Sequence, residues 1–115
     1  MKKEFRIRKR KDFIKVSRSG FFYRANSVLV QCGFGESISY RVGFTASRKV
    51  GGAVVRNRCK RRMRAAAALV LKNLGLSGVD YVLIAKKITS GAKWQDLVDE
   101  ITAAVCFLNG KILKH

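Results

Sequence analysis

The chain has 115 residues, with 25 Lys and Arg against 7 Asp and Glu, and its net charge of +18 favours a polyanionic partner such as nucleic acid. This length suits one domain, and a hydrophobic content of 48% is enough for a buried core and argues against wholesale disorder. No apolar run approaches the roughly 20 residues of a transmembrane helix, and no apolar signal segment follows the basic N-terminus.

The first half of the chain predicts a basic arm, a short helix and two strands. Residues 1–10 are strongly basic, and we expect a flexible arm there because like charges repel. Residues 12–20 place apolar side chains at helical spacing and end at a glycine, which predicts a helix. Residues 27–34 are nearly all apolar and residues 38–46 alternate with period two, so both are predicted to be strands that pair antiparallel. The small, polar face of the second strand, which carries Arg41, is expected to be open to solvent or to a ligand.

The second half predicts a long helix, a central strand and a final helix. Residues 53–74 carry an apolar stripe at helical spacing with an arginine-rich arc opposite, and Gly75 ends this helix. Residues 79–86 are almost wholly apolar, which is typical of a central strand. The last helix is expected to start near Trp94. The order α-β-β-α-β-α indicates a single α+β domain over residues 1–115, a two-layer sandwich of helices on a small sheet.

The three cysteines, Cys32, Cys59 and Cys106, are widely spaced and form no CxxC pair. This pattern argues against a zinc site and against a disulfide framework. We expect three reduced and mostly packed thiols, as in a cytoplasmic protein.

One segment, residues 47–64, holds eight basic residues and no acidic one. Arginine presents a planar fork that grips phosphate in two places, and glycines in the preceding loop let the backbone approach a phosphate chain closely. The loop also leads into a helix N-terminus, whose free amides attract anions. A helix face that merely meets water normally mixes charges of both signs. The single sign therefore favours RNA binding with strong, salt-sensitive affinity.

The same segment closely resembles the signature of the bacterial ribonuclease P protein subunit. The matching positions are Arg48-Lys49-Val50-Gly51, Ala53-Val54, Arg56-Asn57-Arg58, Lys60-Arg61 and Arg64. The likeness continues in the first predicted helix, in the strand before the basic segment, in the strand over residues 80–86 and in the last helix. It implies a ribosomal-protein-like fold in which the crossover between the second and third predicted strands is left-handed.

The resemblance also implies a function. The family's protein is the small subunit of a ribonucleoprotein endonuclease that removes the 5′ leader from precursor tRNA. By that likeness the RNA subunit performs the hydrolysis with Mg²⁺ held by the RNA–substrate complex, and the protein itself supplies no catalytic residue and no metal site. The implied contacts with the RNA subunit are Arg48, Lys49, Arg56, Asn57, Arg58, Lys60, Arg61, Arg62 and Arg64.

The family binds the leader in a cleft between its first helix and an open sheet face. The corresponding candidates are Phe13, Ser17, Arg18, Gln31 and Arg41. Ser17 and Gln31 stand where many relatives have aromatic residues. The ring of Phe13 suits either stacking on a nucleotide or ordinary core packing, and the sequence does not separate the two. The expected partners are ribonuclease P RNA and precursor tRNA, with no membrane and no small-molecule substrate.

Three other functions fit the sequence less well. A structural RNA binder such as a ribosomal protein shares the charge and the size, but it has no need of the Arg-Asn-Arg and Lys-Arg pattern. A free-standing nuclease needs clustered carboxylates or a histidine, and the only histidine is His115 at the end of the chain. Asp96, Asp99 and Glu100 have metal-ligand spacing, but their place in the first turns of a helix accounts for them. A membrane-surface protein needs a large exposed apolar face beside its basic one.

Overall fold

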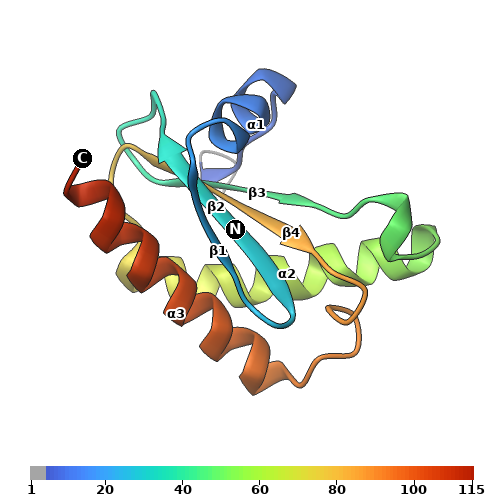
Figure 1. Cartoon of the computed structure of the whole chain (residues 1–115). Coiled ribbons are helices and arrows are strands. Elements are labelled where there is room, and N and C mark those ends of the chain that lie inside the picture. Colours follow the sequence, from blue (N-terminus) through green and yellow to red (C-terminus); the bar gives the residue numbers. More distant parts are fainter. Residues whose placement is uncertain (1–4) are drawn as a thin grey trace.

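The computed structural model describes residues 5–115, in which a four-stranded sheet carries helices on both faces (Figure 1). The elements in chain order are α1 (Arg10–Ser17), β1 (Phe21–Arg24), β2 (Val28–Phe34), β3 (Arg41–Thr45), the short 3₁₀ helix η2 (Arg48–Val50), α2 (Ala53–Leu74), β4 (Val79–Ala85) and α3 (Trp94–Leu113). The α+β class and the three predicted helices are confirmed. Within the described residues, no helix is long and apolar enough to cross a membrane.

The strand order β1-β2-β4-β3 puts β4 in the interior of the sheet, as its apolar sequence predicts. The predicted antiparallel pairing of residues 27–34 with residues 38–46 is wrong. β2 pairs along its whole length with β4 instead, and β3 runs parallel to β4 on the other side. The reason is that the apolar run of β4 can bury both its faces only between two strands, and α2 supplies the long crossover that a parallel β3–β4 pair requires.

The strand β1 has no counterpart in the sequence-based prediction. It is a four-residue edge strand that forms a hairpin with β2, closed by a hydrogen bond from the Ala25 N–H to the Val28 carbonyl of 2.9 Å. Its side chains alternate between half-buried and exposed, and its four residues are too few to show a clear strand period, although three of them are aromatic. The observed order is therefore α-β-β-β-α-β-α.

The two faces of the sheet are covered differently. α2 and α3 pack on one face and enclose the main core, whose largest fully buried side chains include Tyr81, Met63 and Leu71. α1 lies across the other face, where Val16 joins Val82 and Ile7 in a second, smaller cluster (Figure 1). The second face is covered only in part, because α1 has eight residues. This arrangement leaves room for ligands beside α1.

The predicted basic arm over residues 1–10 contacts the sheet through Arg6 and Ile7. Arg6 forms a parallel bridge with Val42, and the Ile7 N–H donates to the Val42 carbonyl at 3.0 Å. Ile7 itself is only 4% exposed. Two apolar residues within the basic run attach this segment to the body of the protein: Ile7 completes the cluster under α1, and the Phe5 ring stacks on Tyr40. Residues 1–4 of the predicted arm lie outside the described residues.

The three thiols are free, and two of them are packed as expected. Cys32 and Cys59 are buried in the main core, whereas Cys106 is exposed on α3. Burial raises the pKa of the Cys32 thiol to about 12, so this group stays protonated at neutral pH.

Candidate nucleic-acid interface

The basic segment forms η2 and the first half of α2, and these lie at the end of the molecule where β3 leaves the sheet (Figure 1). Gly51 joins the two helices with φ of 154°, a backbone conformation that favours glycine, and a Cβ at this position would crowd the Val55 side chain. The residue before α2 is Gly52, which supplies no capping side chain, and the first turn of α2 has no acidic residue. The positive end of the helix dipole therefore adds to the charge of Arg48 and Lys49.

The basic side chains in the first half of α2, together with Asn57, form three rows at helical spacing. Asn57 and Arg61 point away from the body and are exposed. On one flank lie the half-buried residues Arg56, Lys60 and Arg64, and the Arg64 guanidinium sits 5.9 Å from the centre of the Phe44 ring. On the other flank lie Arg58 and Arg62.

The two arginines of the second flank form hydrogen bonds within the protein. The Arg62 guanidinium donates to the carbonyls of Thr89 and Ala92, and Arg58 Nε donates to the Ser90 carbonyl at 2.9 Å. Both arginines thus hold the loop between β4 and α3 against α2. Arg62, which the resemblance implies as a contact of the RNA subunit, is in this structure a residue that supports the fold.

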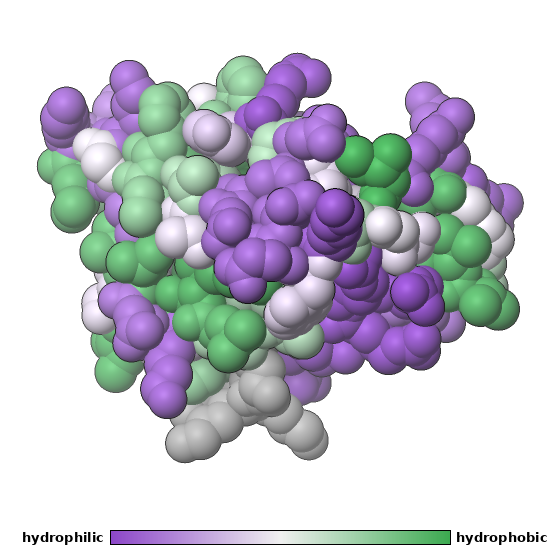
Figure 2. All heavy atoms as spheres, turned by 90° about the horizontal axis from the view of Figure 1, so that it is seen from below, coloured by the Kyte–Doolittle hydropathy of each residue, from purple (hydrophilic) through white to green (hydrophobic). Residues whose placement is uncertain are grey.

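The remaining charge of this segment has no carboxylate partner. Both ion pairs found within residues 5–115 involve Arg41, and neither includes a residue of the basic segment. Arg48, Lys49, Asn57, Arg58 and Arg61 are exposed. In Figure 2 hydrophilic side chains gather in a broad area that continues toward the side of the molecule where the first half of α2 lies. The segment is therefore a concentrated, uncompensated positive surface, which we call the basic surface.

The predicted leader-binding residues are only partly brought together. Phe13, Ser17 and Gln31 line one shallow cavity of about 270 Å³ between α1 and the sheet, together with Arg10, Ile14, Thr45, Val82 and Ile84. We call this cavity the Phe13 cleft. Its floor is the sheet face formed by β2, β3 and β4, and its one cation is Arg10, which the sequence analysis did not single out.

The structure shows the packing of Phe13 and leaves part of its ring accessible from the cleft. Its ring packs against the small cluster around Ile7 and Val82, and it occupies the space above Gly43, where a Cβ would overlap the ring. The ring also remains partly exposed and lines the Phe13 cleft. Because Gly43 has no side chain, the Phe13 ring can lie close to the backbone of β3 and line the cleft.

The other two candidates lie elsewhere. Arg18 follows the end of α1 and lines a different, larger cavity on the opposite side of that helix. Arg41 is held by Asp80, with Nε donating to Oδ1 at 2.9 Å and Nη2 to Oδ2 at 2.6 Å, and Asp12 lies 3.6 Å away. The hydrogen bond that Arg41 donates to the Asp80 carboxylate raises the pKa of Arg41 above its ordinary value. The placement of Arg41 in the leader cleft is therefore corrected: it fixes β3 to β4.

Removing the charge of Asp80 should destabilise the fold. Asp80 is 2% exposed, and Asp80→Asn would leave the Arg41 guanidinium with a weaker partner at a nearly dry site. We expect the free energy of unfolding to fall by about 2 kcal/mol, less than for a fully buried pair because Arg41 is partly exposed. Urea unfolding followed by circular dichroism measures this. Asp99→Asn, on the exposed face of α3, is the matched control, and equal midpoints for the two variants would contradict the role of the ion pair.

Sequence reasoning missed the cavity beside Arg18 altogether. A signal was present, because Lys11, Lys15 and Arg18 follow one another at helical spacing.

No group of three or more His, Cys, Asp or Glu side chains that could hold a metal ion is found among residues 5–115.

Comparisons with known proteins agree on one family. A family model described as Ribonuclease P matches residues 1–107. The chain is 46% identical over 103 residues to the ribonuclease P protein component of Ruegeria pomeroyi, covering 86% of this chain and 82% of that protein. It is 41% identical over 105 residues to the protein component of Caulobacter vibrioides, covering 90% and 70%.

Solved structures show the same fold. The RNase P protein of Staphylococcus aureus matches with a TM-score of 0.75 and 24% identity, covering 90% of this chain and 94% of that one. The RNase P protein of Thermotoga maritima matches with a TM-score of 0.74 and 23% identity, covering 87% and 94%. The fold class implied by the sequence resemblance is thereby confirmed.

Proposed function

The chain belongs to the ribonuclease P protein family, and from this premise we propose how its two RNA-facing surfaces divide their work. As a protein of this family it acts in tRNA processing, as part of a ribonucleoprotein. The basic surface binds the ribonuclease P RNA. The Phe13 cleft binds the 5′ leader of precursor tRNA.

The single observation that supports the first assignment is the uncompensated charge of the basic surface. Arg48, Lys49 and Arg61 are exposed and have no partner in the described structure, so they are free to take phosphates at no structural cost. A folded RNA offers the many closely spaced phosphates that such a surface can neutralise together. Within this proposal, the RNA subunit performs the hydrolysis with Mg²⁺ bound by the RNA–substrate complex.

The leader assignment is supported by the chemistry of the Phe13 cleft. An unpaired leader exposes base faces, which stack on aromatic rings, and base edges, which pair with amides and hydroxyls. The cleft offers the Phe13 ring, the Gln31 amide and the Ser17 hydroxyl, with Arg10 positioned for a phosphate. We place this reaction in the cytoplasm, where precursor tRNA is made in bacteria.

Cleavage of a precursor tRNA at low Mg²⁺ tests the proposed function. The protein alone, a bacterial ribonuclease P RNA alone, and the mixture are compared. We expect cleavage at the mature 5′ end to be much faster in the mixture than with the RNA alone, and absent with the protein alone. Cleavage by the protein alone would place the active site in the protein. Tight RNA binding without any stimulation would favour a structural RNA-binding protein instead.

A further inference from the structure

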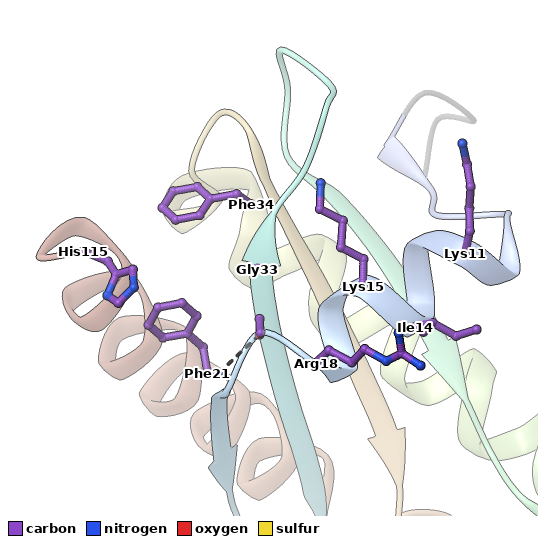
Figure 3. A pocket seen from close by; sticks show the side chains of 9 residues that line it. Lys11, Ile14, Lys15, Arg18, Phe21, Gly33, Phe34 and His115 are labelled. Carbon is purple, nitrogen blue, oxygen red and sulfur yellow. Dashed lines mark hydrogen bonds between the residues drawn. The ribbon is translucent and has the colours of Figure 1, made fainter.

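A large cavity lies on the side of α1 that faces away from the Phe13 cleft. It has a volume of about 620 Å³ and is bounded by α1, by the start of β1, by the end of β2 and by His115. Figure 3 shows two sides of this cavity. Lys11 and Lys15 extend from α1 on one side, and the rings of Phe34, Phe21 and His115 lie on the other. We call it the Phe34 cavity.

One wall of the Phe34 cavity is aromatic. Phe21 meets His115 edge to face with ring centres 5.3 Å apart, and Phe34 stands beside them with 53% of its surface exposed. Phe34 is the last residue of β2 and lies two residues beyond Cys32, where the pairing with β1 ends, so no residue of β1 lies opposite it. Gly33 leaves the floor between Phe34 and α1 without a side chain. A flat apolar group fits a space with such a wall and such a floor.

The opposite wall is cationic. Lys11, Lys15 and Arg18 project from one side of α1 at helical spacing, and all three are exposed. None of them is in an ion pair within residues 5–115, and no carboxylate is among the side chains that line the cavity there. Their charges therefore remain available to a ligand. An aromatic wall that faces a row of cations matches a nucleotide, whose base stacks while its phosphate pairs with the cations.

The Phe34 cavity adjoins the Phe13 cleft. Ile14 lines both, so only the width of α1 separates them. The basic surface is at the other end of the sheet: Phe34 pairs with Val79 at the start of β4, whereas Thr45, which leads toward η2, pairs with Ile84 near the end of β4. The cavity thus extends the leader-binding side of the molecule and not the side assigned to the RNA subunit.

From this geometry we propose that the Phe34 cavity is a second nucleotide site for the single-stranded leader of precursor tRNA. It takes a nucleotide farther from the cleavage point than those in the Phe13 cleft. This inference rests on the proposed function, because it assumes that the Phe13 cleft holds the nearer part of the leader. It makes binding depend on leader length: a short leader ends in the cleft, and a long leader passes over α1 and reaches the cavity.

The test uses the assembled ribonucleoprotein and two precursor tRNAs that differ only in leader length. Phe34→Ala is expected to weaken binding of the long-leader substrate about tenfold, the loss typical of one stacked base, and to leave binding of the short-leader substrate unchanged. Phe34→Trp is expected to retain binding of both. Phe22→Ala is the matched control, since Phe22 is 49% exposed on the neighbouring strand and does not line the cavity. Should Phe34→Ala fail to fold, Phe34→Leu keeps an apolar side chain without a stacking ring.

The cationic wall is tested through salt dependence. Lys15→Ala is expected to reduce the slope of log K against log salt for the long leader by about 0.7, the value for one phosphate of a single strand. Lys72→Ala, an exposed lysine in the last turn of α2, is the control. An unchanged slope for Lys15→Ala would show that this cation does not bind a phosphate of the leader and would contradict the proposed cationic wall.

The outcomes separate this inference from the proposed function. If the complex that contains the unchanged protein has no affinity for the leader of either substrate, leader binding by the Phe13 cleft, as part of the proposed function, is wrong. If it binds both leaders but Phe34→Ala affects them equally or not at all, only the Phe34 cavity fails as a leader site. If Phe34→Ala instead weakens assembly with the RNA subunit, the cavity belongs to that interface and the inference is overturned.

Discussion

A variant carrying Arg48→Ala, Lys49→Ala and Arg61→Ala is expected to bind ribonuclease P RNA far more weakly than the unchanged protein, with little change in stability. All three side chains are exposed, and none has an ion-pair partner in the described structure. Each cation that no longer meets a phosphate should lower the slope of log K against log salt by about one unit, so the slope should fall by about three. Binding of labelled RNA over a series of KCl concentrations measures both effects, and thermal unfolding checks the fold.

Arg62→Ala is the informative control for this variant. Arg62 lies on the same helix, one residue from Arg61, but its guanidinium holds the carbonyls of Thr89 and Ala92. We expect its removal to lower the melting temperature while it changes the salt slope by less than one unit. A salt slope that the triple substitution leaves unaltered would show that the basic surface does not meet the RNA.

The second large effect is expected for Phe13→Ala, because Phe13 packs in the fold and, in our proposal, also stacks on the leader. Loss of its packing over Gly43 and beside Ile7 should lower the free energy of unfolding by about 2 kcal/mol, roughly half the cost for a fully buried phenylalanine. Loss of its ring should also weaken leader binding about tenfold. Affinities for precursor tRNA and for mature tRNA, which has no leader, are compared in the assembled complex.

Phe13→Leu separates the two roles. Leucine retains most of the apolar contact with the cluster under α1, so stability should change by less than about 1.5 kcal/mol. It cannot stack on a base, so the preference for precursor over mature tRNA should fall almost as far as with alanine. If leucine restores both the stability and the preference, the ring acts only in packing, and the cleft binds the leader by other contacts.

The features that could be predicted correctly from the sequence are local ones. The apolar stripe of α2, the glycine that follows it and the nearly continuous apolar run of β4 are patterns of neighbouring residues, and each predicted its element correctly. The basic segment is equally local, since its one-signed charge and its spacing lie within residues 47–64. For the same reason the family could be named from that segment, and the comparisons confirm it.

Which elements contact one another could be learned only from the tertiary structure. Antiparallel pairing of adjacent strands was the simplest interpretation of residues 27–46, but β4 takes the place beside β2 because it buries more apolar surface there. That exchange puts Asp80 opposite Arg41, so a cation expected at the leader becomes part of the fold. Arg62 is similar: its partners are carbonyls of a loop that only the packing of α3 brings near.

The two sides of α1 show most clearly the difference between what a local pattern predicts and what the packing adds. The sequence placed Phe13 and Arg18 together, since both belong to the first helix, yet they face different cavities. Helical spacing fixes which side chains share a face, but it does not say what that face meets. Here the sheet lies under one side of α1, and the ends of β2 and α3 lie beside the other, because the strand order and the docking of α3 put them there. Contacts between residues distant in the chain depend on all the packing at once, and no local pattern records them.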